Sequence, residues 1–473
     1  MDNKLGILCP VASLLSDYGI GDLGKSARRF IDVLFNVNIK LWQILPINIT
    51  NEFNCPYSTI YTFAIEPALV DVESLADEFC LGASDLQSLK RFRKKGKIDY
   101  AFIKKEKMRL LRKAFDRFVE SQKCKLDKFA STRPDIKKYA IFACILKEFN
   151  VSDWRLLPKV YQDEKSVKYQ KFLIEREREI LFEIFIQYSL DCQWKETLRY
   201  AKRKGVKIIG DLPIYPDKNS FDVYSHKDYF KLNKDFLPKV TGGVPPDAFC
   251  SNGQNWGTCV YDWGVIEKNN YEFLINKIVR SLEYCDILRL DHFAGYVEHY
   301  EVHSKNQNLS KWVKGGGDAF FNELSKRVNL SKLVVENLGY LPEECVHVKK
   351  QYDLLGMSVF QFGDFSVEKN NIFYLGTHDN NTFIGFLETL SKKEKRELCE
   401  RINSFSKRTK GILVDCVKYM ISSDAKYIIL QMQDYLFQRE KYRTNIPGIA
   451  ENMWEYRTPN NYEKKLKKFI KLI

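Results

Sequence analysis

Three segments decide the fold that this sequence predicts: Ile287-Leu288-Arg289-Leu290-Asp291-His292-Phe293, Leu333-Val334-Val335-Glu336-Asn337-Leu338-Gly339 and Tyr374-Leu375-Gly376-Thr377-His378-Asp379-Asn380. In each segment an apolar run leads to a carboxylate. A carboxylate that follows an apolar strand is costly to bury, so we expect it at the strand's open end. Three such ends in one chain indicate parallel strands of a barrel, with the carboxylates gathered at one mouth.

The length of the chain, 473 residues, allows a full barrel of eight strands and eight helices with an insertion. Strand-like and helix-like segments alternate, which favours a parallel α/β design. We therefore predict an α/β fold, a (β/α)8 TIM barrel with a helical insertion and long active-site loops. The expected strands include Leu41–Pro46, Val206–Leu212, 286–291, 332–336, 355–361 and 372–378.

The predicted barrel is interrupted once. Residues 72–170 are rich in Lys and Glu, contain few Gly or Pro and show helical periodicity, which indicates a helical insertion subdomain. Residues 1–71 are then the first part of the catalytic barrel and 171–473 the remainder, beginning with a long helix near 170–204. The region 213–263 is rich in turn residues, and so long an irregular stretch in a compact fold indicates an active-site loop region.

The net charge of +14 requires that nucleic-acid and membrane binding be considered. Basic runs occur at 90–97 and 464–471. In the second run Leu466, Phe469, Ile470 and Ile473 follow helical spacing, so the lysines are expected on the solvent face of a docked helix. No nucleic-acid motif is present and no apolar run approaches the roughly 20 residues of a membrane span. We expect neither partner, although salt-dependent DNA retention would favour a nucleic-acid-binding protein.

The 12 cysteines are scattered, without a C-x-x-C pair or a Cys/His cluster of zinc spacing. This pattern favours reduced thiols in a cytoplasmic protein. The apolar piece at 6–10 is too short for a signal peptide. His292 and His378 lack a second ligand at metal-site spacing, so we expect no metal and no organic cofactor.

The three carboxylates each have a catalytic and a structural interpretation. Arg289 lies on the same side of its strand as Asp291 and is expected to keep it ionised at a low pKa, either as a nucleophile or in a structural ion pair. Partial burial, or the charge of Asp379, is expected to raise the pKa of Glu336 for use as a general acid, unless Glu336 caps a helix. Asp379 lies in a polar cluster suited to sugar hydroxyls, or caps a helix. Two carboxylates that flank a glycosidic bond are the usual means of cleaving it.

Further motifs accompany these segments from Gly6 to Arg457. With them the chain resembles the 4-α-glucanotransferases of the amylomaltase, or disproportionating enzyme, type in the α-amylase clan. The motifs that carry the resemblance are Tyr18–Gly24, Trp42–Pro46, Pro56–Ser58, Gln193–Trp194, Gly210–Tyr215, Gly243–Phe249, Gly253–Gly257, Gly356–Met357, Gln361–Phe362 and Arg443–Gly448.

The resemblance implies a retaining transfer of an α-1,4-glucan segment from a maltodextrin donor to the 4-hydroxyl of an acceptor glucan or glucose. It implies that Asp291 is the nucleophile, Glu336 the acid/base and Asp379 the residue that stabilises the transition state through sugar hydroxyls. The substrate-binding residues that it implies are Arg289, His292 and His378 around the glucose at the cleavage point, Asp211 in support, and Tyr57, Asp247, Gln254 and Trp256 along the groove. It makes no prediction of oligomeric state.

The chain departs from the family pattern at several positions near the site. Ala294 stands where the family usually has Arg, and Asn337 and Asn381 each stand where it has Asp. Thr258-Cys259 replaces Asn-Pro, and Gly315-Gly316-Gly317 replaces Gly-Pro-Gly. No catalytic carboxylate is lost, but charge is removed. Two alternatives therefore stay open, an α-glucan hydrolase that uses the same carboxylates and a non-catalytic glucan-binding homologue.

Overall fold

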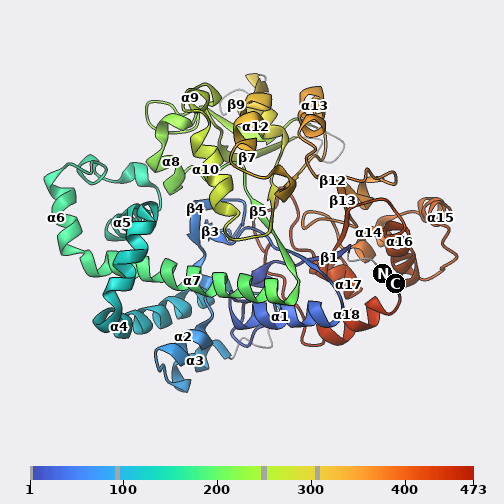
Figure 1. The fold of residues 1–473 in the computed structure, drawn as a ribbon, viewed down its shortest axis with the longest axis horizontal. Helices are drawn as coiled ribbons and strands as arrows, with labels where there is room; N and C mark the ends of the chain where they lie inside the picture. Colours follow the sequence, from blue (N-terminus) through green and yellow to red (C-terminus); the bar gives the residue numbers. More distant parts are fainter. Residues whose placement is uncertain (1–3, 91–95, 247–252, 304–308) are drawn as a thin grey trace.

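A closed ring of eight parallel strands lies at the centre of the molecule. The computed structural model describes residues 4–90, 96–246, 253–303 and 309–473 (Figure 1). The strands follow the order β11-β8-β5-β2-β1-β14-β13-β12, and Val335 N–H closes the ring by donating to the Leu355 carbonyl at 2.8 Å, next to β12. The predicted (β/α)8 barrel is confirmed. The strands are β1 (Leu5–Leu8), β2 (Leu41–Gln43), β5 (Lys207–Leu212), β8 (Ile287–Leu290), β11 (Leu333–Val335), β12 (Gly356–Val359), β13 (Asn371–Tyr374) and β14 (Tyr427–Gln431).

The strands are almost wholly apolar because barrel strands are buried on both faces. Alternate side chains fill the barrel interior, and the others pack against the surrounding helices. The interior cluster contains Leu8, Leu41, Ile209, Ile287, Val334, Met357, Val359, Ile372, Tyr374 and Ile429. This alternation decides which polar side chains at the strand ends point into the mouth.

Helices cover the outside of the barrel (Figure 1). The helices described outside the insertion are α1 (Lys25–Asn36), α8 (Phe221–Ser225), α9 (Trp263–Lys268), α10 (Glu272–Ser281), α11 (Ala294–Val297), α12 (Gly317–Ser325), α13 (Glu343–Gln351), α14 (Phe383–Thr389), α15 (Lys392–Arg401), α16 (Thr409–Ile421), α17 (Met432–Tyr435) and α18 (Tyr462–Ile470). In α18 the side chains of Leu466 and Phe469 are fully buried and Lys464, Lys467 and Lys468 are exposed, as the spacing predicts. Among the helices described, none is long and apolar enough to cross a membrane.

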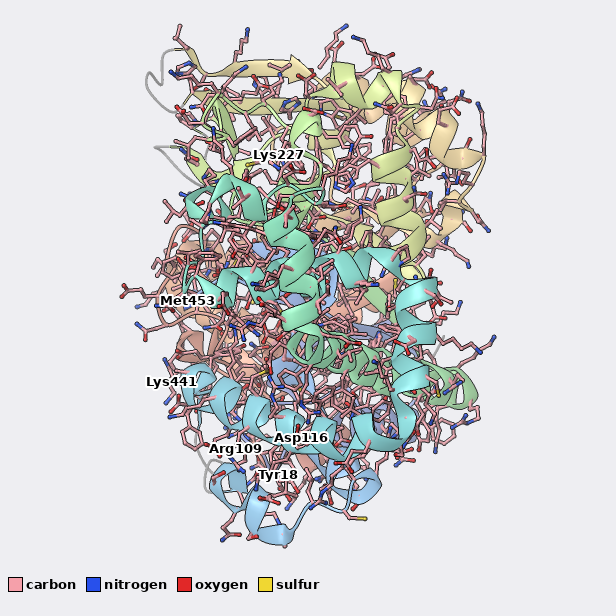
Figure 2. All side chains as sticks on the ribbon, turned by 90° about the vertical axis from the view of Figure 1, so that its left-hand side faces the viewer. Tyr18, Arg109, Asp116, Lys227, Lys441 and Met453 are labelled. Atoms are coloured by element: carbon pink, nitrogen blue, oxygen red, sulfur yellow. The ribbon has the colours of Figure 1, made fainter. Side chains whose placement is uncertain are left out.

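The part of the chain that joins β4 (Thr59–Ile65) to β5 forms a layer of helices, which lies on the left of Figure 1. It comprises α2 (Val72–Glu78), α3 (Ala83–Lys90), α4 (Tyr100–Thr132), α5 (Pro134–Glu148), α6 (Val167–Glu175) and α7 (Glu177–Lys204). Figure 2 turns this side toward the viewer, with Arg109 and Asp116 labelled on α4. The apolar face of α4 packs on α7, where Phe118 lies 5.0 Å from Phe185 between ring centroids. The boundaries given above for the insertion remain a prediction.

Two details differ from the expected elements. The helix expected near 170–204 is divided into α6 and α7, because Arg176 has non-helical dihedral angles of φ −113° and ψ 17°. The region 213–263 contains regular structure, since β6 (Val240–Val244) and β7 (Gln254–Cys259) belong to a second, antiparallel sheet of order β10-β9-β6-β7. Its other strands are β9 (Glu298–His303) and β10 (Lys311–Lys314), and β3 (Asn48–Thr50) pairs with β4 in a hairpin.

Candidate active site

The register of the barrel strands brings the predicted carboxylates together. Asp211 on β5 is paired with Arg289 on β8, and Val335 on β11 is paired with Leu290. Asp291 N–H extends the β5–β8 ladder to the Leu212 carbonyl at 3.2 Å, and Glu336 N–H extends the β8–β11 ladder to the Leu290 carbonyl at 3.1 Å. Asp291 and Glu336 therefore follow adjacent strands at the same level.

Strand alternation turns these side chains into the mouth. Ile209, Ile287 and Val334 belong to the interior cluster. Because side chains two residues apart share a face of a strand, Asp211, Arg289, Asp291 and Glu336 continue the interior rows past the apolar core. The apolar part of each strand thus builds the floor of the site, and its last residues supply the chemistry.

Arg289 joins three carboxylates. Its Nη1 lies 2.7 and 2.8 Å from the two oxygens of Asp211 and 3.1 Å from Asp291 Oδ1, and its Nη2 lies 2.8 Å from Glu336 Oε2. The side chains of Arg289 and Asp211 are 3% and 0% exposed, whereas those of Asp291 and Glu336 are 21% and 22% exposed. Asp211 therefore contacts the guanidinium on its buried side, and of the three carboxylates only Asp291 and Glu336 face the opening.

The backbone turns sharply at His292, whose φ is 44°. Left-handed backbone is uncommon outside glycine and costs energy that functional sites often store. The turn directs His292 N–H to Glu336 Oε2 at 2.7 Å, and the next N–H, of Phe293, donates to the Glu336 carbonyl at 3.2 Å. The strained residue thus fixes the carboxylate of Glu336 relative to Asp291.

The predicted pKa order of the two carboxylates is wrong. Burial, with the charge of Glu336, raises the pKa of Asp291 well above its usual value despite Arg289. Burial opposes ionisation of Glu336 too, but the charge of Arg289 and the His292 N–H outweigh it and lower the pKa of Glu336. The order is reversed because Arg289, 2.8 Å from Glu336 and 3.1 Å from Asp291, and the His292 N–H favour the ionised form of Glu336, whose charge raises the pKa of Asp291.

Asp379 lies in the loop after β13, and two residues from the segment after β14 hold it there. Asn445 Nδ2 donates to Asp379 Oδ1 at 2.6 Å, and Arg443 Nη2 donates to the Asp379 carbonyl at 2.8 Å. Burial would raise the pKa of Asp379, but the charge of His378 and the hydrogen bonds from His378 and Asn445 lower it to about 2. Its side chain is 43% exposed, so an ionised carboxylate faces the opening.

Neither helix-cap interpretation fits. Helix α13 begins at Glu343 after Pro342, well beyond Glu336, and the N-cap of α14 is Thr382 and not Asp379. The ion pair between Arg289 and Asp291 is present, but it forms part of a larger group that is open on one side.

Aromatic side chains line both sides of the carboxylates. The ring of Tyr57 stacks on His378 at 5.1 Å and 13°, and its hydroxyl donates to Asp211 Oδ2 at 2.7 Å. Trp256 on β7 contacts the His292 ring edge to face at 4.8 Å, and its Nε1 donates to Gln254 Oε1 at 3.0 Å. All the substrate-binding residues predicted from the resemblance are brought near the carboxylates except Asp247, which lies outside the described residues.

Sequence reasoning missed three residues of this site. Arg443 and Asn445 stood in a recognised motif without a role, and Trp454, whose ring centroid lies 6.0 Å from that of His378, carried no signal. All three come from the segment after β14, which crosses back to the mouth. Within the described parts of the chain, no group of three or more His, Cys, Asp and Glu could hold a metal ion.

The chain is similar to known proteins over almost its entire length. Residues 9–462 match the family model described as 4-alpha-glucanotransferase. The chain belongs to this family. A 4-alpha-glucanotransferase of Clostridium butyricum is 35% identical over 468 residues, 95% of each chain, and one of Aquifex aeolicus is 34% identical over 480 residues, 98% of this chain and 97% of the relative. The solved amylomaltase of Streptococcus agalactiae, in complex with acarbose, has a TM-score of 0.93 at 26% identity and covers 99% and 98% of the two chains.

Family membership makes the chain a transferase, and it favours neither the hydrolase nor the non-catalytic alternative. The departures from the family pattern leave the carboxylate group intact. Asn337 Oδ1 accepts the N–H of Met357 at 2.6 Å, a contact that an Asp would also make. Ala294 is buried at the start of α11, and the Asn381 carbonyl accepts from Gln361 at 2.9 Å. Nothing in the structure explains the Thr258-Cys259 and Gly315–Gly317 departures.

Proposed function

We propose that this chain transfers a segment of an α-1,4-glucan to the 4-hydroxyl of an acceptor glucan or glucose by a retaining double displacement. One observation carries the proposal: Asp291 and Glu336 contact the two terminal nitrogens of the same Arg289 guanidinium, at 3.1 and 2.8 Å, at the open end of the barrel. Two carboxyl groups held by one guanidinium fit the separation of about 5–5.5 Å of a retaining pair better than the roughly 6.5–9.5 Å that an inverting mechanism needs for its water. The arrangement therefore supports retention through a covalent intermediate.

In the first half of the reaction, Asp291 attacks the anomeric carbon as the bond to the leaving glucan breaks. Glu336 gives its proton to the leaving oxygen. Because the pKa of Asp291 is raised and that of Glu336 is lowered, the mechanism requires the proton of the pair to be on Glu336 before Asp291 attacks. Asp379, ionised and half exposed, is placed to accept hydroxyls of the glucose at the cleavage point.

In the second half, Glu336 accepts the proton of the acceptor 4-hydroxyl. The acceptor oxygen then bonds to the anomeric carbon and Asp291 leaves. Transfer requires that a sugar reach this position in place of water, and oriented binding of the acceptor can supply that preference. Trp256, held against His292, supports such binding at the edge of the site.

Incubation with maltotriose tests the proposal. A transferase converts it to glucose and a ladder of longer oligosaccharides, whereas a hydrolase yields only shorter sugars and a binding protein yields none. Asp291→Asn is the control, since it should abolish the ladder while maltotriose still binds. Wild-type protein that gives only shorter sugars, or no product, would contradict the proposal.

We also infer a cytoplasmic location. Every cysteine among the described residues is free, in keeping with a reducing compartment. Fractionation of cells that express the chain with its natural ends tests this inference, and recovery with the envelope would contradict it.

A further inference from the structure

Three aromatic side chains form a cluster outside the catalytic group. Tyr300 on β9 and Trp312 on β10 have ring centroids 5.5 Å apart, and Tyr340, in the loop between β11 and α13, lies 5.4 Å from Trp312. Tyr340 is 66% exposed. Single exposed aromatic residues are ordinary, but three adjoining rings with one so open form a continuous apolar surface.

Local structure places these rings together. Tyr300 and Trp312 are directly opposite each other in the antiparallel pairing of β9 and β10, so their side chains share one face of the hairpin. Gly339, with φ 72°, allows the turn that delivers Tyr340 to Trp312. The cluster therefore depends on a strand pair and a tight turn and not on a chance contact of long side chains.

Two features connect the cluster with the catalytic group. Tyr340 follows Glu336 by four residues, so the two α-carbons are at most about 14 Å apart. Glu336 acts on the oxygen that links the transferred glucose to the leaving chain. In addition, Trp312 and Trp256 belong to one four-stranded sheet, on its two edge strands β10 and β7, and Trp256 contacts His292. The Tyr340 loop thus begins at Glu336, and the sheet that supports Trp312 reaches the site at β7.

We propose that Tyr340, supported by Trp312 and Tyr300, forms an outer subsite for the leaving or acceptor glucan, several glucose units from the cleaved bond. Sugar rings carry an apolar C–H face that packs on aromatic rings, as the amphipathic surface of Tyr and Trp allows. The subsite takes a neutral α-1,4-linked glucose unit and confers a preference for longer acceptors. This inference rests on the proposed transfer function.

Acceptor length is the variable that tests the subsite. With a fixed donor, Tyr340→Ala should raise KM about 3- to 10-fold for a maltohexaose acceptor and leave the KM for glucose unchanged, because glucose does not reach Tyr340. Tyr340→Phe should restore the wild-type KM, since stacking needs the ring and not the hydroxyl. Phe405→Ala is the matched control, because Phe405 is 96% exposed in the loop before α16.

Binding measured without turnover separates the subsite from the transfer function. In an inactive Glu336→Gln background, calorimetry should show the same loss with Tyr340→Ala for maltoheptaose and none for maltose. If this holds although wild-type protein makes no ladder from maltotriose, the subsite stands and the transfer proposal fails. Equal effects on short and long sugars, or a change in oligomeric state on Tyr340→Ala, would overturn the subsite and indicate a structural role or a second copy of the chain.

Discussion

Two of the buried cations among the described residues differ in their surroundings, Arg289 at the barrel mouth and Lys107 where α4 meets the barrel. Lys107 is 1% exposed and donates to the carbonyls of Ala68 and Val70, both at 2.7 Å. Burial lowers its pKa to about 8, although Asp22 and Asp71 oppose the shift. Burial also opposes the charge of Arg289, but there the surrounding carboxylates prevail and its pKa lies well above the usual value.

The difference between the two groups lies in what the carboxylates do. Asp22 accepts the N–H of Ser26 at 3.0 Å and Asp71 accepts the N–H of Glu73 at 3.0 Å, and both residues are at most 4% exposed. Asp291 and Glu336 are instead more than a fifth exposed, and both contact the guanidinium of Arg289. A buried charge whose carboxylate partners are hydrogen-bonded to backbone N–H groups stabilises the fold. A buried charge whose partners face an opening is available for chemistry.

Arg289, Asp211, Asp291 and Glu336 form the open group, and removal of its acid/base, Glu336, should have the largest effect on activity. Glu336→Gln is expected to lower kcat for transfer from maltotriose by about 10²–10⁴-fold, because the leaving oxygen loses its proton donor. The midpoint of thermal unfolding should change little, since the amide still accepts the His292 N–H. Glu343→Gln, an exposed change at the start of α13, is the control. A Glu336→Gln variant that retains more than about a tenth of the wild-type rate would exclude Glu336 as the acid/base.

The next largest effect is expected in the pH dependence of activity, which reports on Asp291 and Glu336. One proton on the Asp291–Glu336 pair is the active form, so kcat/KM should be bell-shaped in pH. The acid limb follows the lowered pKa of Glu336, below the usual 4.5, where a second proton binds, and the alkaline limb follows the raised pKa of Asp291, where the last proton leaves. Each limb should fall about tenfold per pH unit. Rates measured with maltotriose at constant ionic strength, over the pH range in which the protein stays folded, check this, and a profile without an alkaline limb would contradict a shared proton.

The sequence predicts some features of this site and not others. The barrel and the convergence of Asp291 and Glu336 follow from apolar strands that end in carboxylates, because strand period and parallel register leave little choice. The pKa order does not follow, because it depends on the His292 backbone donor, and a turn with positive φ has no signature in a histidine. Asn445 and Trp454 were missed for a related reason: only the tertiary path after β14 brings them to Asp379 and His378.

Lys107, Asp22 and Asp71 form the closed group, and a change in this group should alter the stability of the protein and not its activity. Lys107→Met leaves the carbonyls of Ala68 and Val70 without a donor, so we expect a loss of about 1–3 kcal/mol in the free energy of unfolding. Urea titration gives this value from the transition midpoint, and kcat at 25 °C should stay within about twofold of wild type because the site is untouched. Lys113→Met on the same helix is the control, since Lys113 is 48% exposed and its surface ion pair with Asp85 should contribute little. A large fall in kcat without loss of stability would show that the two groups are not separate.

The smallest effect is expected at the rim of the open group, where Asn445 holds Asp379. Asn445→Ala removes one hydrogen bond to an ionised carboxylate that is 43% exposed, so water replaces part of the lost contact. We expect kcat/KM to fall about 3- to 10-fold. The pKa of Asp379 should rise from about 2, because one of the contacts that lower it is gone. Asn460→Ala, an exposed change near α18, is the control. An Asn445→Ala variant with wild-type kcat/KM would mean that the contacts with His378 and Arg443 suffice to hold Asp379, and that Asn445 has no part in the function of the site.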